Sequence, residues 1–245
     1  MRGGVGAAAV LLIAAALGEC VTPAQAETQT ASPEEPHLLI FSGSDLWRHW
    51  AFAHGGVLWS PAGLYHEGFT LKLLHNGGAY RYRSGELGDV NVIGRQLAVT
   101  VQPGWRFKRA GFEATVFAGL DMQSFQFTPD DPSSRLRGRH IGLRGGVELW
   151  YEPSPTTMLA ADASVSSLKA GNSARVAYGW RMFDRFYLGP EVQAFATDPY
   201  QQLRAGIHIT GFKSGEREWS GAIGWGDDSD RRAGAYLRIS VMVRR

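Results

Sequence analysis

The sequence predicts an all-β protein, an antiparallel transmembrane β-barrel of the outer-membrane type with about 12 strands. Apolar and polar residues alternate with a period of two through most of the chain, which is typical of strands whose two faces meet different surroundings. The 31 Gly, 8 Trp, 8 Tyr and 12 Phe suit sheets and tight turns better than helices. Many alternating segments approach the roughly 9–11 residues that a tilted strand needs to cross a bilayer.

The first 26 residues have the features of a secretory signal peptide. Arg2 supplies a positive charge, and residues 5–17 form an apolar stretch that is shorter than a membrane span of about 20 residues. Ala24-Gln25-Ala26 then offers the small-x-small pattern of a cleavage site. We therefore expect export to the outer membrane of a Gram-negative bacterium.

The only cysteine, Cys20, raises the alternative of a lipoprotein. Lipid attachment requires a small residue just before the cysteine, and Glu19 occupies that position, so cleavage after Ala26 is favoured. The mature chain then has no disulfide, although it lies where disulfides could form. Residues 27–36, rich in Pro, Glu and Thr, are expected to be a flexible lead-in, and residues 37–245 to be the barrel.

The alternation is clearest in two neighbouring segments, 97–107 and 112–123. Their apolar faces consist of Leu97, Val99, Val101, Pro103, Trp105 and Phe107, and of Phe112, Ala114, Val116, Ala118, Leu120 and Met122. Phe117 is the one large apolar residue on the polar face of the second segment. The same pattern continues in 140–149, 175–182, 203–210 and 232–244.

One segment breaks the pattern. Phe69, Leu71 and Leu73 share one parity, whereas Tyr80 and Tyr82 have the other. Asn76-Gly77-Gly78 lies between them, and we expect a β-bulge or a tight turn there. A turn would change the strand count.

Counting strands from residue 37 predicts which connections share an end of the barrel. The external loops are expected near 84–90, 128–138, 168–173, 196–199 and 226–231. The opposite connections, near 108–111, 153–156 and 183–185, are short. Short periplasmic turns and longer outer loops are typical of transmembrane barrels.

A soluble, lipocalin-like barrel has the same alternation with its apolar face turned inward. The membrane form is favoured because the polar face carries opposed charges and the apolar face has many small residues that would pack a soluble core poorly. Six tryptophans near expected strand ends suggest aromatic girdles: Trp47, Trp50, Trp59, Trp105, Trp150 and Trp180. Trp50 and Phe52 could stack on sugars, but membrane anchoring is the favoured role.

Ionisable residues of the predicted inward face are candidate lumen-lining residues: Arg106, Glu113, Asp121, Arg144, Glu148, Arg181, Glu191, Arg204, His208 and Arg238. They could line a solute-selecting pore or form a salt-bridged plug. The plug is favoured because a barrel of about 12 strands is narrow, whereas wide aqueous channels need about 16–18.

No catalytic, metal or cofactor site is expected. His54, His66, His140 and His208 are scattered, without ligand spacing or a cysteine partner. His208 and Thr210 share one strand face and could serve a barrel lipid hydrolase, but two ordinary lumen residues are favoured. The net charge of +2 gives no indication of a nucleic-acid partner.

Several segments resemble the cellulose biosynthesis protein BcsS family over about residues 38–245. They are 41–48 (FSGSDLWR), 54–61 (HGGVLWSP), 68–72 (GFTLK), 80–85 (YRYRSG), 189–191 (GPE) and 204–206 (RAG). The resemblance implies a part in making or exporting cellulose and brings no catalytic residues. The expected function is a non-enzymatic barrel that assists cellulose biosynthesis, secretion or surface anchoring. The expected partners are outer-membrane lipid and, if the resemblance holds for partners too, cellulose or other cellulose-synthesis proteins. The alternative function is a general small-solute porin.

Overall fold

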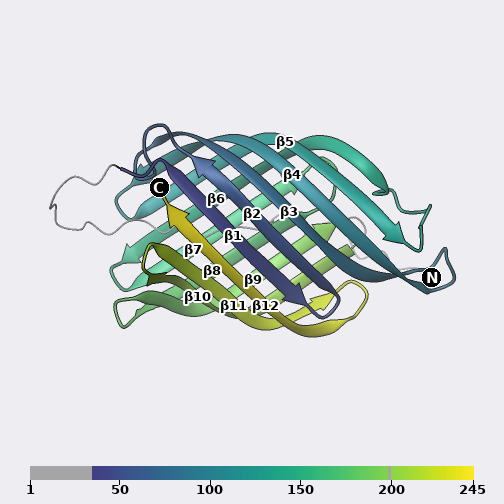
Figure 1. Cartoon of the computed structure of the whole chain (residues 1–245). Coiled ribbons are helices and arrows are strands. Elements are labelled where there is room, and N and C mark those ends of the chain that lie inside the picture. Colours follow the sequence, from purple (N-terminus) through teal and green to yellow (C-terminus); the bar gives the residue numbers. More distant parts are fainter. Residues whose placement is uncertain (1–34, 198–199) are drawn as a thin grey trace, which may run out of the picture.

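The computed structural model describes residues 35–197 and 200–245, so the predicted signal peptide (1–26) and most of the predicted lead-in (27–36) lie outside the described residues. The described residues form an all-β protein, a closed antiparallel barrel of 12 strands (Figure 1). They contain no helix long and apolar enough to span a membrane. The predicted fold class and strand count are confirmed.

Each strand pairs with its neighbours in sequence, and pairing of the first strand with the last closes the barrel. Leu39 pairs with Arg244 at one end of this closing seam, and Trp47 pairs with Tyr236 at the other. The strands are β1 (Leu38–Trp47), β2 (Trp50–Trp59), β3 (Gly68–Ser84), β4 (Val90–Arg109), β5 (Phe112–Thr128), β6 (Gly138–Ser154), β7 (Thr157–Ser166), β8 (Asn172–Met182), β9 (Phe186–Thr197), β10 (Tyr200–Ser214), β11 (Arg217–Asp228) and β12 (Ala233–Arg244).

The connections divide between the two ends of the barrel. At the terminal end, Leu38 and Arg245 are joined by backbone hydrogen bonds of 2.7 Å, beside the connections 60–67, 110–111, 155–156, 183–185 and 215–216. The opposite end, called the loop end, carries 48–49, 85–89, 129–137, 167–171 and 229–232. The grouping of loops predicted from strand parity agrees with this arrangement. The connection 60–67 is a long terminal-end segment that parity did not anticipate.

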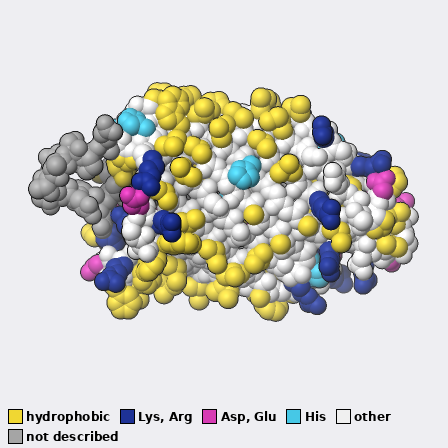
Figure 2. All heavy atoms as spheres, viewed as in Figure 1, with side chains coloured by type: hydrophobic (Ala, Val, Ile, Leu, Met, Phe, Trp, Pro, Cys, Tyr) yellow, Lys and Arg dark blue, Asp and Glu magenta, His cyan; other side chains and the backbone are white. Residues whose placement is uncertain are grey.

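The outer surface of the barrel is apolar. Ile141, Leu143 and Leu203 are 74%, 64% and 60% exposed, and the apolar faces predicted for 97–107 and 112–123 also point outward. Figure 2 shows hydrophobic side chains across the middle of the visible face, with charged side chains gathered towards the two ends. Such an apolar band between polar ends matches the hydrocarbon layer of a bilayer, whereas a soluble barrel would bury these side chains.

The prediction of a bulge or turn at Asn76-Gly77-Gly78 was wrong. β3 pairs with β2 and β4 in unbroken register through this segment, with Gly77 opposite both Ala53 and Leu97. The apparent change of parity arises because Tyr80 and Tyr82 point into the lumen, where the loop end of the barrel is aromatic. The strand is continuous, and only the chemistry of its inner face changes along its length.

The predicted aromatic girdle was wrong for three tryptophans. Trp59, Trp105 and Trp180 are 43%, 48% and 51% exposed on the outer surface, as expected. Three others point inward: Trp47 and Trp150 are buried, and Trp50 lies beside Arg204 inside the barrel. Phe52 also lines the lumen, so neither Trp50 nor Phe52 anchors the membrane.

An arginine in place of Leu120 tests whether the outer surface lies in lipid. Leu120 is 50% exposed near the middle of β5, so Leu120→Arg should lower the free energy of unfolding by about 2–4 kcal/mol in lipid vesicles. Ile93→Arg, on the same outer surface but at the loop end of β4, should cost only about 0–1 kcal/mol because the penalty falls towards the interface. Equal, small effects in denaturant titrations of the two variants would contradict a lipid-facing surface.

Candidate functional site in the barrel lumen

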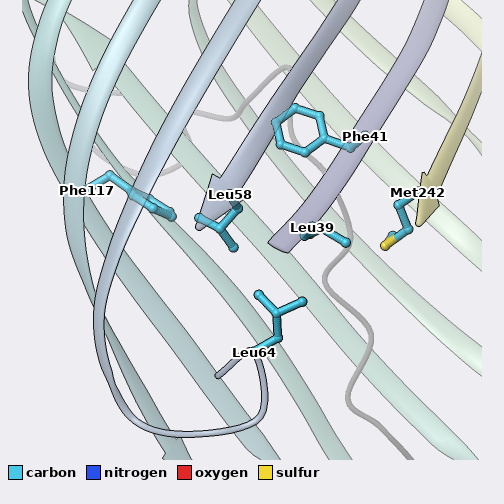
Figure 3. Packing of buried hydrophobic residues seen from close by; sticks show 6 residues of the cluster. All are labelled: Leu39, Phe41, Leu58, Leu64, Phe117 and Met242. Carbon is cyan, nitrogen blue, oxygen red and sulfur yellow. The ribbon is translucent and has the colours of Figure 1, made fainter. Parts of the chain in front are cut away.

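An apolar cluster fills one side of the lumen at the terminal end. It consists of the buried side chains Leu39, Phe41, Leu58, Leu64, Phe117 and Met242. Leu64 belongs to the connection 60–67, which folds beneath the strand ends so that this side chain reaches the cluster (Figure 3). Its backbone N–H donates to Pro36 O (2.8 Å), and Arg106 donates to its carbonyl. The long connection thus covers part of the terminal opening.

A second apolar cluster lies on the opposite side of the terminal end and contains Trp150, Met158, Ala160 and Tyr187. The Tyr187 hydroxyl donates to Glu152 Oε1 (2.9 Å) and accepts from Arg181 (2.7 Å). The rings of Trp150 and Tyr187 meet edge to face at 5.8 Å. Apolar packing therefore narrows the lumen from both sides here.

Charged side chains occupy the middle of the lumen. Arg175 pairs with Asp162 (2.9 Å) and Glu191 (3.6 Å), and Glu191 also pairs with Arg238 (2.6 Å). This chain of alternating charges links β7, β8, β9 and β12. All its members except Arg238 are at least 95% buried. Opposed charges at this depth must be paired, because an isolated ion there would lose its hydration without compensation.

Tyr236 braces this network. Its hydroxyl donates to Glu191 Oε1 (2.9 Å). The ring lies across Gly206 and Gly224, where an added Cβ would come within 2.4 Å and 2.7 Å of Tyr236 atoms. Glycine at these two inward positions leaves the space that the tyrosine occupies.

Two further ion pairs in the lumen involve β3, β5 and β6. Lys72 on β3 pairs with Glu148 on β6, strands that are not neighbours, so this contact crosses the lumen. The Lys72 ammonium also lies 5.1 Å from the centre of the Phe117 ring, a cation–π contact at the edge of the apolar cluster. Arg144 pairs with Asp121 at 3.0 Å. The charged and apolar layers are thus in direct contact.

Arg204 and Asp45 form the most enclosed ion pair near the loop end. Arg204 Nη1 donates to both carboxylate oxygens of Asp45, at 2.8 and 3.0 Å, and both side chains are almost completely buried. The guanidinium group also lies 4.4 Å from the Trp50 ring and 4.7 Å from the Phe195 ring. Arg is suited to this position because its planar cation can bind a carboxylate and stack on aromatic rings together.

His208 and Thr210 are hydrogen-bonded but enclosed. His208 Nδ1 lies 2.9 Å from Thr210 Oγ1, and Nε2 lies 3.1 Å from the Tyr178 carbonyl oxygen. Their exposed fractions are 0% and 1%. Both imidazole nitrogens are engaged and neither residue reaches solvent, so this arrangement does not present a nucleophile to a lipid substrate.

The structure places all ten candidate lumen residues inside the barrel, and it brings eight of them into ion pairs. His208 and Arg181 make the hydrogen bonds described above. The lumen ion pairs include four further residues that were not among the sequence-predicted candidates: Asp45, Lys72, Asp162 and Arg175. Strand parity could have indicated Asp162 and Arg175; Asp45 lies on a strand with apolar residues on both faces.

A cavity of about 270 Å³ lies at the loop end, above the Arg204–Asp45 pair; we call it the vestibule. Its wall is largely apolar and aromatic, with amide side chains between the rings. The aromatic members are Trp47, Trp50, Phe52, Tyr80, Tyr82, Phe127, Phe195 and Tyr200. A smaller cavity of about 50 Å³ adjoins it, since Asn76 and Gly171 line both, and ends at Lys72, Glu148 and Phe117.

The connection 129–137 helps to hold the vestibule wall in place. The Tyr82 hydroxyl donates to Asp131 Oδ2 (2.8 Å), and Ser133 donates to Oδ1 through its hydroxyl (2.5 Å) and its N–H (3.1 Å). These hydrogen bonds, chiefly that from the Ser133 hydroxyl, lower the pKa of Asp131. The carboxylate therefore stays ionised at neutral pH and keeps Tyr82 against the wall.

Residues 35–197 and 200–245 contain no group of three or more His, Cys, Asp or Glu side chains arranged to hold a metal ion. The lumen carboxylates are instead committed to arginine or lysine partners. The arrangement can support ion pairing and aromatic contact in the vestibule.

An apolar exterior, a charged lumen and a closed antiparallel sheet define a β-barrel of the outer-membrane class. The fold resembles the COG4313 outer membrane channel from Pseudomonas putida F1, with a TM-score of 0.53 and 9% identity over 89% of this chain and 100% of that chain. It also resembles the TodX deltaS2S3 mutant monoaromatic hydrocarbon channel, with a TM-score of 0.50 and 8% identity over 87% of this chain and 91% of that chain. These likenesses concern the fold alone.

The chain belongs to the family of the cellulose biosynthesis protein BcsS, which matches residues 39–245. A comparison with curated proteins gave no match. The match covers the barrel from the second residue of β1 to residue 245. The protein is therefore an outer-membrane-type barrel of a cellulose biosynthesis family.

Removal of the Asp45 carboxylate tests the importance of the buried pair. Asp45→Ala leaves Arg204 buried without its counter-ion and should lower the free energy of unfolding by about 3–5 kcal/mol. The matched variant Asp130→Ala breaks the exposed pair of Asp130 with Arg137 and should cost about 0–1 kcal/mol. Denaturant titration in micelles gives both values, and a cost for Asp45→Ala no larger than that of the control would refute the assignment.

Proposed function

We propose that this protein is a non-enzymatic outer-membrane barrel that assists cellulose secretion or anchors the polymer at the cell surface, beside a separate export pore. The observation that carries the proposal is the filled lumen. Apolar clusters occupy the terminal end, and ion pairs such as Lys72–Glu148 cross the middle. A glucan chain passing through would have to displace these groups together, which supports a scaffold over a conduit.

The proposed membrane orientation rests on the difference between the connections at the two ends of the barrel. We place the loop end outside the cell and the terminal end in the periplasm, as barrels with short periplasmic turns and even strand numbers have both termini inside. The vestibule then faces the surface on which the secreted polymer emerges. The apolar outer face contacts lipid, and the exposed connections 85–89 and 129–137 are available to the polymer or to other cellulose-synthesis proteins.

The lumen supports the porin and lipid-hydrolase alternatives less well. A porin requires a water-filled path, whereas the lumen charges lie in pairs such as Arg204–Asp45 and Arg238–Glu191. A hydrolase requires an accessible nucleophile and base, whereas His208 and Thr210 are enclosed.

Deletion of the gene should lower extracellular cellulose several-fold or trap the polymer inside the cell, and a plasmid copy should restore it. The reason is that a scaffold beside the export pore is required for efficient release even though no polymer passes through its own lumen. Cellulose is measured in the medium, on the surface and in lysed cells, with an empty plasmid as control. Outer-membrane permeability to a dye is measured in parallel, so that general leakage is recognised. Unchanged amount and location of cellulose in the deletion strain would reject the proposed function.

A further inference from the structure

We propose that the vestibule is a carbohydrate-binding site that holds an uncharged segment of a glucan chain against its aromatic wall. The site would take pyranose sugars, whose faces are apolar and whose edges carry hydroxyl groups. Its identification with cellulosic β-glucan rests on the proposed function, whereas the sugar-binding character rests on the vestibule itself.

The aromatic wall is built from β2, its neighbour β3, and β9, which is not a neighbour of β2 and reaches it across the lumen. Trp50 packs edge to face with Phe52 (5.0 Å between ring centres) and with Phe195 of β9 (5.7 Å). Tyr80 lies opposite Trp50 in the β2–β3 register, and its ring centre is 6.0 Å from that of Tyr82. The faces of such rings carry partial negative charge and attract the partly positive C–H groups on a sugar face. The wall therefore offers several stacking surfaces within one cavity.

Two inward-facing glycines allow the aromatic rings to lie flat against the barrel wall. A Cβ added at Gly78 would lie 2.6 Å from the Phe52 ring, and one at Gly94 would lie 2.5 Å from the Tyr80 ring. The two rings therefore lie against the backbone of the neighbouring strand. This arrangement lines the cavity of about 270 Å³ with aromatic surface without filling it.

Polar atoms without protein partners stand beside these rings. Among the described residues, Trp50 Nε1, Asn76 Oδ1 and Gln202 Nε2 are buried and have no hydrogen-bond partner. All three residues line the vestibule, and Gln202 is only 3% exposed. Buried polar atoms are nearly always satisfied in native proteins, so such atoms indicate a ligand or solvent that completes them. Two donors and one acceptor match hydroxyl groups, which both donate and accept.

The charges around the vestibule favour a neutral ligand. Arg204 at its base is neutralised by Asp45, and Arg232 near its mouth pairs with Asp228 (2.8 Å) and Asp230 (2.9 Å). Arg81 and Arg83 also line the cavity, from the outward parity at the loop end of β3. A carboxylated sugar would thus find the arginines at the base and mouth, Arg204 and Arg232, already paired with carboxylates, whereas an uncharged sugar needs only the rings and amides.

The closed base determines how a chain would sit. Arg204 is held by Asp45 and lies against Trp50, Phe195 and Tyr236, so it forms a floor under the aromatic wall. A glucan entering from the loop end would be bound over a short segment and could not continue through the barrel. The vestibule therefore suits capture of a chain end or an exposed loop of polymer.

Binding is tested with full-length mature protein in detergent micelles and soluble cellohexaose, by calorimetry. Saturable binding is expected for the wild type, and Trp50→Leu should weaken it about tenfold or more because one stacking surface is lost. The matched control Trp105→Leu, on the outer surface, should bind like the wild type. Tyr80→Leu is the second test variant in case loss of the Trp50–Arg204 contact disturbs folding, and heat-dependent gel mobility checks that each variant is folded.

Absence of saturable cellohexaose binding, or equal affinity of folded Trp50→Leu, Tyr80→Leu and the wild type, would overturn the proposal. Stronger binding of oligogalacturonate than of cellohexaose would overturn its neutral-ligand part. Maltohexaose serves as the linkage control; preferential binding of this α-glucan would overturn the assignment to β-glucan. The proposed function fails separately, because it is judged by cellulose in the deletion strain: binding without a cellulose defect would leave the vestibule assignment intact.

Discussion

The structure depends first on closure of the sheet by the β1–β12 pairing. Within hydrocarbon no water can satisfy backbone N–H and C=O groups, so a membrane-spanning sheet must have no free edge. The seam from Leu39–Arg244 to Trp47–Tyr236 removes the two edges that a linear 12-strand sheet would leave. Closure also divides every strand into a lipid-facing and a lumen-facing set of side chains, which is the origin of the period-two pattern.

Closure at 12 strands makes the lumen small enough for side chains to meet across it, and the contents of the lumen follow from that. Charges brought together in this confined space must pair, as Lys72 with Glu148 and Arg204 with Asp45 do. Where polar pairing ends, the space is filled by apolar clusters at the terminal end and by aromatic rings at the loop end. The barrel is thus asymmetric along its axis, with its larger cavity at one end only.

The fold could be predicted from the sequence because alternation survives in nearly every strand, as in Leu97 to Phe107. The positions of individual aromatic residues could not, because parity separates two faces without saying which chemistry each face needs at a given height. Trp47 and Trp50 lie on strands with apolar residues on both faces, and Tyr80 and Tyr82 follow a lumen that becomes aromatic. Contacts such as Asp45–Arg204 join residues 159 positions apart, and they depend on a barrel register that local pattern does not contain.

The central claim is that the barrel is a blind vestibule rather than a pore. Single-channel recording of the purified protein in planar lipid bilayers tests it most directly. The paired charges and apolar clusters predict no steady conductance above the lipid background at moderate voltage. A stable, ion-selective conductance from the folded wild-type protein would contradict the account and identify an open path through the lumen.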